Sequence, residues 1–205
     1  MFSEVFLVNI ARVQIFEVFL TFHILGLTGR NAAGKGAVAE ILKQKSFIYH
    51  SLSDTLRDEL RNNGKKESRE NLIQVGNNFR KSGGPSVLAD LMIKNLVSLD
   101  HHVVDSIRNP AEVDSLNRTY LNHKFSLITV NALPEIRFKR LKDRNRIGDS
   151  SSWEEFVHQE SLEEKSDNPN KQQLFGTILK ADFRVDNSGT LTELNQQINK
   201  IINQL

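Results

Sequence analysis

From residue 23 onward, short apolar runs alternate with stretches whose apolar residues recur at helical spacing. The apolar runs are rich in β-branched residues and are typical of strands buried on both faces of a parallel sheet. Because such runs alternate with helices, the pattern predicts an α/β domain with a parallel five-stranded sheet and helices on both faces. The predicted strands are residues 23–28, 46–50, 101–105, 125–132 and 181–187.

Three of the predicted helices have recognisable first turns. A capping residue followed three positions later by glutamate occurs at Asn109–Glu112, Ser152–Glu155 and Thr190–Glu193, and Pro110 follows the first of these caps. A capping side chain accepts a hydrogen bond from the backbone of the first turn, and the glutamate can bond back to the cap. We therefore expect helices to begin directly after these three residues.

Two segments interrupt the alternation of strand and helix. Residues 53–98 contain about three helical stretches between the second and third strands, which is more than one crossover needs. We interpret them as a small helical insertion. Residues 144–152, RNRIGDSSS, are charged and serine-rich without an apolar period, which predicts a mobile loop. We expect the working domain to span residues 23–205.

The first 22 residues are unusually apolar but do not have the pattern of a membrane span. Glu4, Arg12 and Glu17 interrupt them, whereas a spanning helix needs roughly 18–20 apolar residues. Neither a basic start nor a small-residue cleavage site is present. Residues 1–22 are therefore interpreted as an N-terminal extension of unknown role, either packed on the domain or lying upstream of it.

Composition narrows the function classes. Of the 205 residues, 39% are hydrophobic and 25% charged, which indicates a folded protein and excludes a disordered one. A net charge of +2 is too small to drive nucleic-acid or membrane attachment, so we expect small-molecule partners. Cysteine is absent, which excludes thiolate chemistry and is compatible with the cytoplasm, where we expect the protein. The adjacent His101 and His102 point to opposite faces of a strand and do not predict a metal site.

The strongest chemical motif is Gly29-Arg-Asn-Ala-Ala-Gly34-Lys35-Gly36, which follows the first predicted strand and opens a helix. It satisfies the G-x4-G-K pattern of a phosphate-binding loop (P-loop) in the required context. Backbone N–H groups and the helix N-terminus can surround phosphate oxygens, and Lys35 adds a full positive charge. We expect ATP to be bound by Gly29, Arg30, Asn31, Ala32, Ala33, Gly34, Lys35, Gly36 and Ala37.

The residue after the motif lysine is Gly36, where many P-loops carry a serine or threonine that ligates Mg²⁺. The metal must then be held by water, substrate phosphates and other carboxylates. Asp105 ends a predicted strand at the carboxyl edge of the sheet, where ligands of open α/β sheets bind. We expect Asp105 to hold Mg²⁺, although an aspartate at this position can also cap the following turn.

Arginines supply candidate sites for the second substrate. Arg108 lies three residues after Asp105 and can bind an acceptor phosphate through a bidentate fork, or lie in solvent. Asp54 and Arg57 lie one helical turn apart, so they either both face the cleft or pair with each other. Arg80 is a further acceptor-site candidate.

The predicted loop 144–152 begins with two arginines close in sequence, Arg144 and Arg146. Their mutual repulsion favours a role in which an anion lies between them, although a solvated face is the alternative. A kinase must keep its transferring phosphoryl group from water. We therefore interpret the loop as a lid that brings Arg144 or Arg146 onto the reacting phosphates.

These motifs resemble those of the nucleoside monophosphate kinases, in which G-K-G is common. The similar stretches are Ser51-Leu-Ser53-Asp54-Thr-Leu56-Arg57, Asp105-Ser-Ile-Arg108 and Arg144-Asn-Arg146-Ile-Gly-Asp149. The ending ADFRVDNSGTLTEL is similar to that of dephospho-coenzyme A kinases. The runs SLSDTLRDEL, ENLIQVGN and VVDSIRNPAEV, with ADFRVDNSGT from that ending, look like those of predicted nucleotide kinases also found fused to deoxycytidylate deaminases. The resemblance covers residues 23–205.

The resemblance implies a three-layer nucleotide kinase that uses ATP and Mg²⁺ to phosphorylate a nucleoside or deoxynucleoside monophosphate. The helical insertion would bind the acceptor through Ser53, Asp54, Arg57 and Arg80, together with Arg108 after the third predicted strand. The candidate catalytic residues are Lys35, Asp54, Asp105, Arg108, Arg144 and Arg146. Two alternatives remain open: phosphorylation of a hydroxyl, as in dephospho-coenzyme A kinases, which needs a carboxylate base, and a non-catalytic module regulated by nucleotide binding. Oligomeric state is left open.

Overall fold

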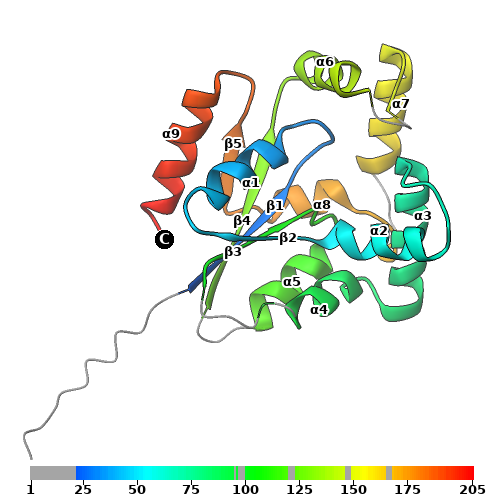
Figure 1. Ribbon diagram of the computed structural model, residues 1–205, viewed down its shortest axis with the longest axis horizontal. Helices are drawn as coiled ribbons and strands as arrows, with labels where there is room; N and C mark the ends of the chain where they lie inside the picture. The colour runs from blue at the N-terminus through cyan, green and yellow to red at the C-terminus, as the bar shows by residue number, and fades with distance from the viewer. Residues whose placement is uncertain (1–21, 95, 97–99, 120–122, 146–148, 165–167) are drawn as a thin grey trace, which may run out of the picture.

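In a computed structural model of the chain, the structure describes residues 22–94, 96, 100–119, 123–145, 149–164 and 168–205 (Figure 1). The predicted N-terminal extension therefore lies outside the described residues except for Phe22, which begins the first strand. Arg146, one of the two lid arginines, also lies outside them.

The described residues form the predicted α/β fold around a five-stranded sheet in the order β2-β3-β1-β4-β5. All four strand pairs are parallel, which confirms the parallel sheet. The strands are β1 (Phe22–Thr28), β2 (Ile48–Ser51), β3 (His102–Asp105), β4 (His123–Asn131) and β5 (Phe183–Asp186).

The second strand begins two residues later than the pattern predicts, at Ile48 and not at Ser46. Ser46 has a φ of 67°, which is incompatible with a strand, and the chain turns there after α1. Phe47 is buried in the core next to that turn. Strand pairing therefore starts only where the backbone becomes extended.

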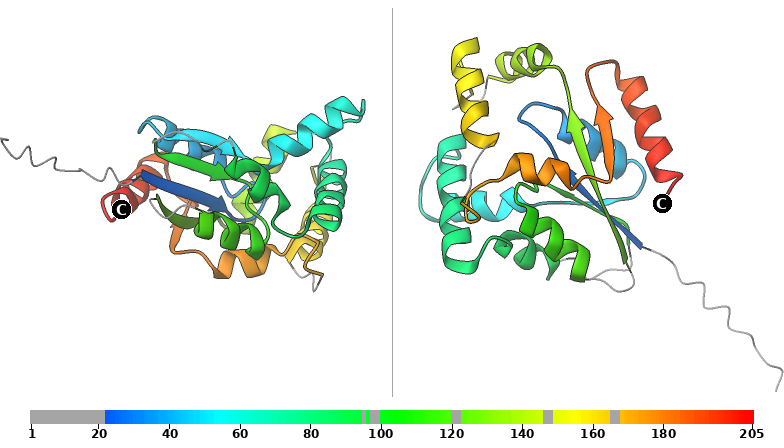
Figure 2. Two further views of the ribbon diagram at one scale, coloured as in Figure 1. Left: turned by 90° about the horizontal axis from the view of Figure 1, so that it is seen from below. Right: turned by 180° about the vertical axis from the view of Figure 1, so that it is seen from behind.

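Nine helices are described, and they cover both faces of the sheet (Figure 2). One hydrophobic cluster joins the sheet to α1 and α9, and a second joins it to α2, α4 and α5. The segment 53–98 contains most of α2 together with α3 and α4. The helices are α1 (Lys35–Lys43), α2 (Leu52–Asn62), α3 (Arg69–Gly83), α4 (Val87–Ile93), α5 (Pro110–Thr119), α6 (Pro134–Arg144), α7 (Trp153–Glu164), α8 (Leu174–Leu179) and α9 (Leu191–Ile202).

Helix α7 is attached to α6 next to the predicted lid segment. Arg137 on α6 is 2% exposed and forms an ion pair with Glu160 on α7. The Arg137 guanidinium also lies 5.3 Å from the centre of the Phe156 ring. These contacts hold α7, which follows residues 144–152 in the chain, against α6. Within the described ranges, no helix is both long and apolar enough to cross a bilayer.

The three predicted helix starts are confirmed, and the most complete one is at α9. Thr190 Oγ1 accepts a hydrogen bond from the Glu193 backbone, and Glu193 accepts one from the Thr190 backbone at 2.7 Å. These bonds from Thr190, first from its backbone and then from its side chain, hold the pKa of Glu193 below its usual value. The carboxylate is thus favoured in the folded state.

Replacing Glu193 with glutamine is expected to lower stability at pH 7 but to have little effect in acid. Because the folded-state pKa is depressed, the stabilisation is present above the ordinary value of 4.5 and is lost as pH falls through the folded value. Thermal midpoints of both proteins between pH 7 and pH 3 should therefore converge. Midpoints that differ as much at pH 3 as at pH 7 would contradict this expectation.

Candidate active site

The P-loop motif forms the connection between β1 and α1, as its sequence predicts. Gly29 has a φ of 134°, and a Cβ there would lie 2.1 Å from the carbonyl oxygen of Val130. Gly34 has a φ of 99° and would place a Cβ 1.9 Å from the Asn187 amide nitrogen. Both positions therefore require glycine, for backbone conformation and for space.

Lys35 lies at the start of α1 and folds back over the loop. Its Nζ donates hydrogen bonds to the carbonyl oxygens of Gly29, at 2.9 Å, and Arg30, at 3.1 Å. Asn31, Ala32, Gly34, Lys35 and Gly36 line a cavity of about 1080 Å³. Of the other predicted loop residues, Ala33 is buried in the core and Ala37 packs against it. Lys35 therefore lies at the cavity wall, with its ammonium group held by the loop carbonyls.

Two residues that sequence reasoning missed support the back of the P-loop. Asn187 Nδ2 donates to the carbonyl oxygen of Ala33 at 2.9 Å. Arg140 on α6 donates to the same carbonyl at 3.3 Å and to that of Asn187 at 2.8 Å. Arg140 also lines the cavity. The sequence does carry one signal for Arg140. It lies four residues before Arg144 on the same helix, and side chains at i and i+4 share a face.

Asp105 lies at the carboxyl end of β3, as predicted, and also lines the cavity. One carboxylate oxygen accepts from the Ser106 backbone at 2.5 Å, and the other lies 3.4 Å from the Tyr49 hydroxyl. Burial, followed by the negative charge of Asp105, raises the pKa of Tyr49 to about 12. The phenol therefore stays protonated at neutral pH and donates to Asp105.

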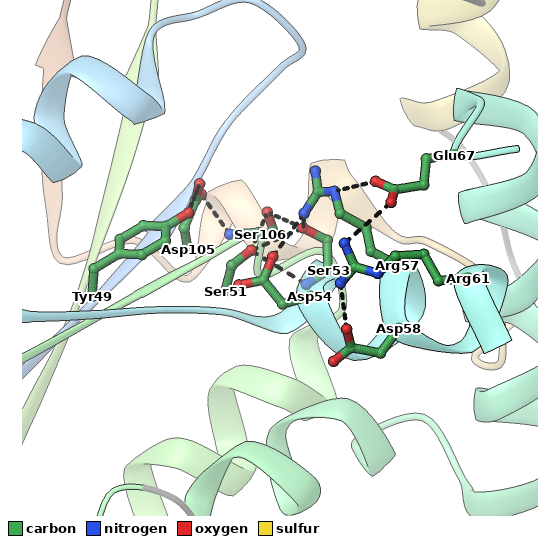
Figure 3. A network of polar contacts seen from close by, with 10 residues as sticks. All are labelled: Tyr49, Ser51, Ser53, Asp54, Arg57, Asp58, Arg61, Glu67, Asp105 and Ser106. Carbon is green, nitrogen blue, oxygen red and sulfur yellow. Dashed lines mark hydrogen bonds and ion pairs between the residues drawn. The ribbon is translucent and has the colours of Figure 1, made fainter.

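On the far side of the cavity, Arg57 pairs with Asp54, which is the second of the two alternatives that the sequence left open, and it also lines the cavity. Its NH1 group forms an ion pair with Asp54 at 2.9 Å and donates to Ser53 Oγ at 2.9 Å. Glu67 lies within 3.4 Å of Arg57 and 3.3 Å of Arg61 (Figure 3). Ser53 and Arg57 line the cavity, whereas Asp54 pairs with Arg57 without lining it.

Arg80 is 2% exposed, and its closest polar partner is the fully buried Glu112. Two of its nitrogens, Nε and NH2, donate to one oxygen of Glu112. The other oxygen accepts the backbone N–H groups of Arg108 and Asn109, at 2.8 and 3.0 Å. Arg80 therefore helps to position the loop that carries Arg108. The sequence predicted Glu112 as part of a helix cap, but it did not reveal the buried ion pair with Arg80.

Arg144, the described lid arginine, connects the lid segment to the P-loop. Its guanidinium bonds both oxygens of Asp149 at 2.7 Å and Asn31 Oδ1 at 3.1 Å. The sequence predicted either an anion between Arg144 and Arg146 or a solvated face; in the structure the carboxylate of Asp149 is the anion that pairs with Arg144. Arg144 also lines the cavity, and its bond to Asn31 places it on the P-loop side.

Comparison with known proteins agrees with this geometry. No protein-family model matches the chain. It is 30% identical to a UPF0200 protein of Pyrococcus furiosus over 189 residues, which cover 89% of this chain and 97% of that protein. The chain belongs to the UPF0200 family. A UPF0200 protein of Pyrococcus horikoshii is 28% identical over an equal length.

Solved structures similar to this UPF0200 chain include two kinases. A shikimate kinase from Bacteroides thetaiotaomicron superimposes with a TM-score of 0.57 at 12% identity, covering 90% of this chain and 99% of that one. A gluconokinase from Sinorhizobium meliloti gives 0.53 at 14% identity, covering 91% and 93%. The chain therefore shares the fold of these two kinases.

Proposed function

We propose that this UPF0200 chain transfers the γ-phosphoryl group of ATP to a nucleoside or deoxynucleoside monophosphate. The observation that carries the proposal is one cavity of about 1080 Å³ with the P-loop lysine in its wall and Arg57 and Arg108 also lining it. A phosphoryl donor and a phosphoryl acceptor can thus meet in one cavity. Catalysis of this reaction depends mainly on positioning and charge stabilisation, which such a cavity provides.

At the donor side, the P-loop backbone and Lys35 would bind the outer phosphates of ATP. Arg144 lies within reach of the same loop through its bond to Asn31. Asp105 fits a role in holding Mg²⁺, since it offers a carboxylate at the cavity wall and Mg²⁺ commonly combines one or two carboxylates with water and phosphates. When bound, the metal would offset phosphate charge. Among the described residues, no group of three or more His, Cys, Asp or Glu side chains comes together to hold a metal, so water and phosphates would supply the other ligands.

The bonding partners of the carboxylates that line the cavity favour a phosphate acceptor over a hydroxyl acceptor. A hydroxyl must lose its proton to a base, whereas a monophosphate is already an anionic nucleophile. Among the carboxylates that line the cavity, Glu67 pairs with two arginines and Asp149 pairs with Arg144. Asp105 is bonded to Ser106 and Tyr49 and is the metal candidate. The described cavity therefore offers arginines for a phosphate but not an uncommitted carboxylate base.

The test is an acceptor panel. The protein is incubated with ATP, Mg²⁺ and each of the common ribo- and deoxyribonucleoside monophosphates or dephospho-coenzyme A, and both ADP and the phosphorylated product are measured. We expect at least one monophosphate to raise ADP formation above background hydrolysis. Product from dephospho-coenzyme A alone would support the hydroxyl alternative, and no product from any acceptor would support a non-catalytic nucleotide-binding module.

Replacing Arg144 by alanine is expected to lower turnover far more than ATP affinity. The guanidinium would act on charge that develops in the transition state, so its loss affects the reacting complex more than the ground state. Steady-state turnover and equilibrium ATP binding are measured on the same preparation. Lys142→Ala is the matched control, because Lys142 lies on the same helix, bonds the Ser151 carbonyl and does not line the cavity. Equal losses of turnover and affinity would contradict a transition-state role.

A further inference from the structure

Three serine hydroxyls meet at the carboxyl ends of β2 and β3, beside Arg57 (Figure 3). Ser51 Oγ and Ser53 Oγ are 2.8 Å apart, and each lies 3.3 Å from Ser106 Oγ. Arg57 donates to Ser53 Oγ from the other side. Ser53 and Ser106 both line the cavity, so this cluster belongs to the wall between Asp105 and Arg57.

The hydrogen-bond directions within this cluster leave one proton unused. Ser53 Oγ accepts from Arg57, and Ser51 Oγ accepts from the Ser53 backbone, so both hydroxyl protons point into the cluster. The Ser51 and Ser53 hydroxyls carry one proton each, so one proton bridges the 2.8 Å contact between them and the other is donated to Ser106 Oγ, which is on the acceptor side of both 3.3 Å contacts. A hydroxyl carries one proton, and that of Ser106 is not donated to any group among the described residues. The positive charge of Arg57 polarises the hydroxyl groups that are bonded in series after it, which makes Ser106 a stronger hydrogen-bond donor.

Ser106 also has an unfavourable backbone conformation. Its φ is 70°, in the left-handed region that favours glycine. The backbone N–H of Ser106 donates to Asp105, and the next residue, Ile107, is held by bonds to Leu27 and Thr28 of β1. The turn therefore fixes the conformation, and glycine would adopt it with less strain. A serine held in such a conformation at a cavity wall indicates that its side chain has a use.

We propose that the Ser106 hydroxyl donates a hydrogen bond to a phosphate oxygen of the acceptor nucleotide, which makes Ser106 an acceptor-binding residue. The proposal rests on the proposed phosphotransferase function and adds a residue to it. The ligand atom must accept a hydrogen bond, because the available group is a donor. It must also tolerate two nearby arginines, Arg57 and Arg108, which line the same cavity. A phosphate oxygen meets both requirements.

The experiment uses Ser106→Gly, which removes the hydroxyl and relieves the backbone. We expect its thermal midpoint to rise by about 2–4 °C, while the KM for the acceptor rises about tenfold or more. The dissociation constant for ATP should not change, because Ser106 is not part of the P-loop. Ser106→Ala keeps the Cβ and should show the same rise in KM without the gain in stability. Equilibrium binding of the acceptor monophosphate without ATP gives a second readout that does not depend on catalysis.

Ser46→Gly is the matched control. Ser46 is an exposed serine with a φ of 67° in the turn before β2, outside the cavity lining. Its replacement should raise the thermal midpoint similarly and leave all kinetic constants unchanged. If the wild type phosphorylates a monophosphate and Ser106→Gly leaves acceptor KM and binding unchanged, only the inference about Ser106 is overturned. If the wild type neither binds nor phosphorylates any monophosphate, the proposed function fails as well.

Discussion

Replacing Lys35 by alanine is expected to abolish most phosphotransfer and to weaken ATP binding by about ten- to a hundredfold, the value of a charged hydrogen bond. The Lys35 ammonium group lies at the wall of the cavity and bonds the carbonyls of Gly29 and Arg30. In a P-loop, this charge is the group that meets the outer phosphates of the nucleotide. Because Lys35 is not part of the hydrophobic core, the unfolding midpoint should remain close to that of the wild type.

The measurements are equilibrium ATP binding in the presence of Mg²⁺ and turnover with an active acceptor. Lys43→Ala is the matched control, because Lys43 lies on the same helix and pairs with Glu40 in solvent. That variant should bind ATP like the wild type, since exposed ion pairs contribute little. Unaltered ATP affinity in a folded Lys35→Ala protein would contradict the assignment of the P-loop.

Replacing Glu112 by alanine is expected to lower the free energy of unfolding by about 3–5 kcal/mol, the usual cost of leaving one member of a buried ion pair without its partner. Glu112 is 0% exposed and Arg80 is 2% exposed, so the remaining guanidinium would lose its counter-charge out of reach of water. The backbone N–H groups of Arg108 and Asn109 would lose their acceptor at the same time. Binding of the acceptor should weaken because this loop carries Arg108.

Urea unfolding of the wild type and Glu112→Ala tests this expectation. The double variant Arg80→Met with Glu112→Met should recover part of the stability, since it removes both charges and fills the space with apolar groups. Glu40→Ala, at an exposed position of α1, is the control and should change the free energy of unfolding by less than about 0.5 kcal/mol. A loss in Glu112→Ala as small as that of the control would show that the buried pair does not stabilise the fold.

The amino-acid sequence by itself determined the features that depend on neighbours in the chain. The alternation of apolar runs and helices predicted the parallel sheet, and it was confirmed. The P-loop could be identified because its glycines, lysine, preceding strand and following helix are contiguous. Helix caps such as Thr190–Glu193 were predictable for the same reason, since both hydrogen-bonding partners lie within one turn.

Strand ends were less accurate, and the reason is also local. A run of apolar residues indicates burial, but it does not report the backbone angle of each residue. The left-handed conformation of Ser46 delays β2 by two residues, although serine there gives no signal of a turn. The same limitation concealed Ser106, whose φ of 70° is set by the bond of its own N–H group to Asp105 and by the bond of Ile107 to β1.

The tertiary structure alone decided which charges face the cavity and which neutralise one another. Arg80 and Glu112 are 32 residues apart in sequence and form a buried pair, whereas Arg140 reaches the P-loop from 107 residues away. Asp54, by contrast, pairs with Arg57 one turn away on the same helix. Sequence spacing determines the contacts within one helical turn. A long side chain can also contact residues far away in sequence, and only the packing of the helices decides which of these are within reach. The roles of these arginines therefore depend on the arrangement of helices around the sheet.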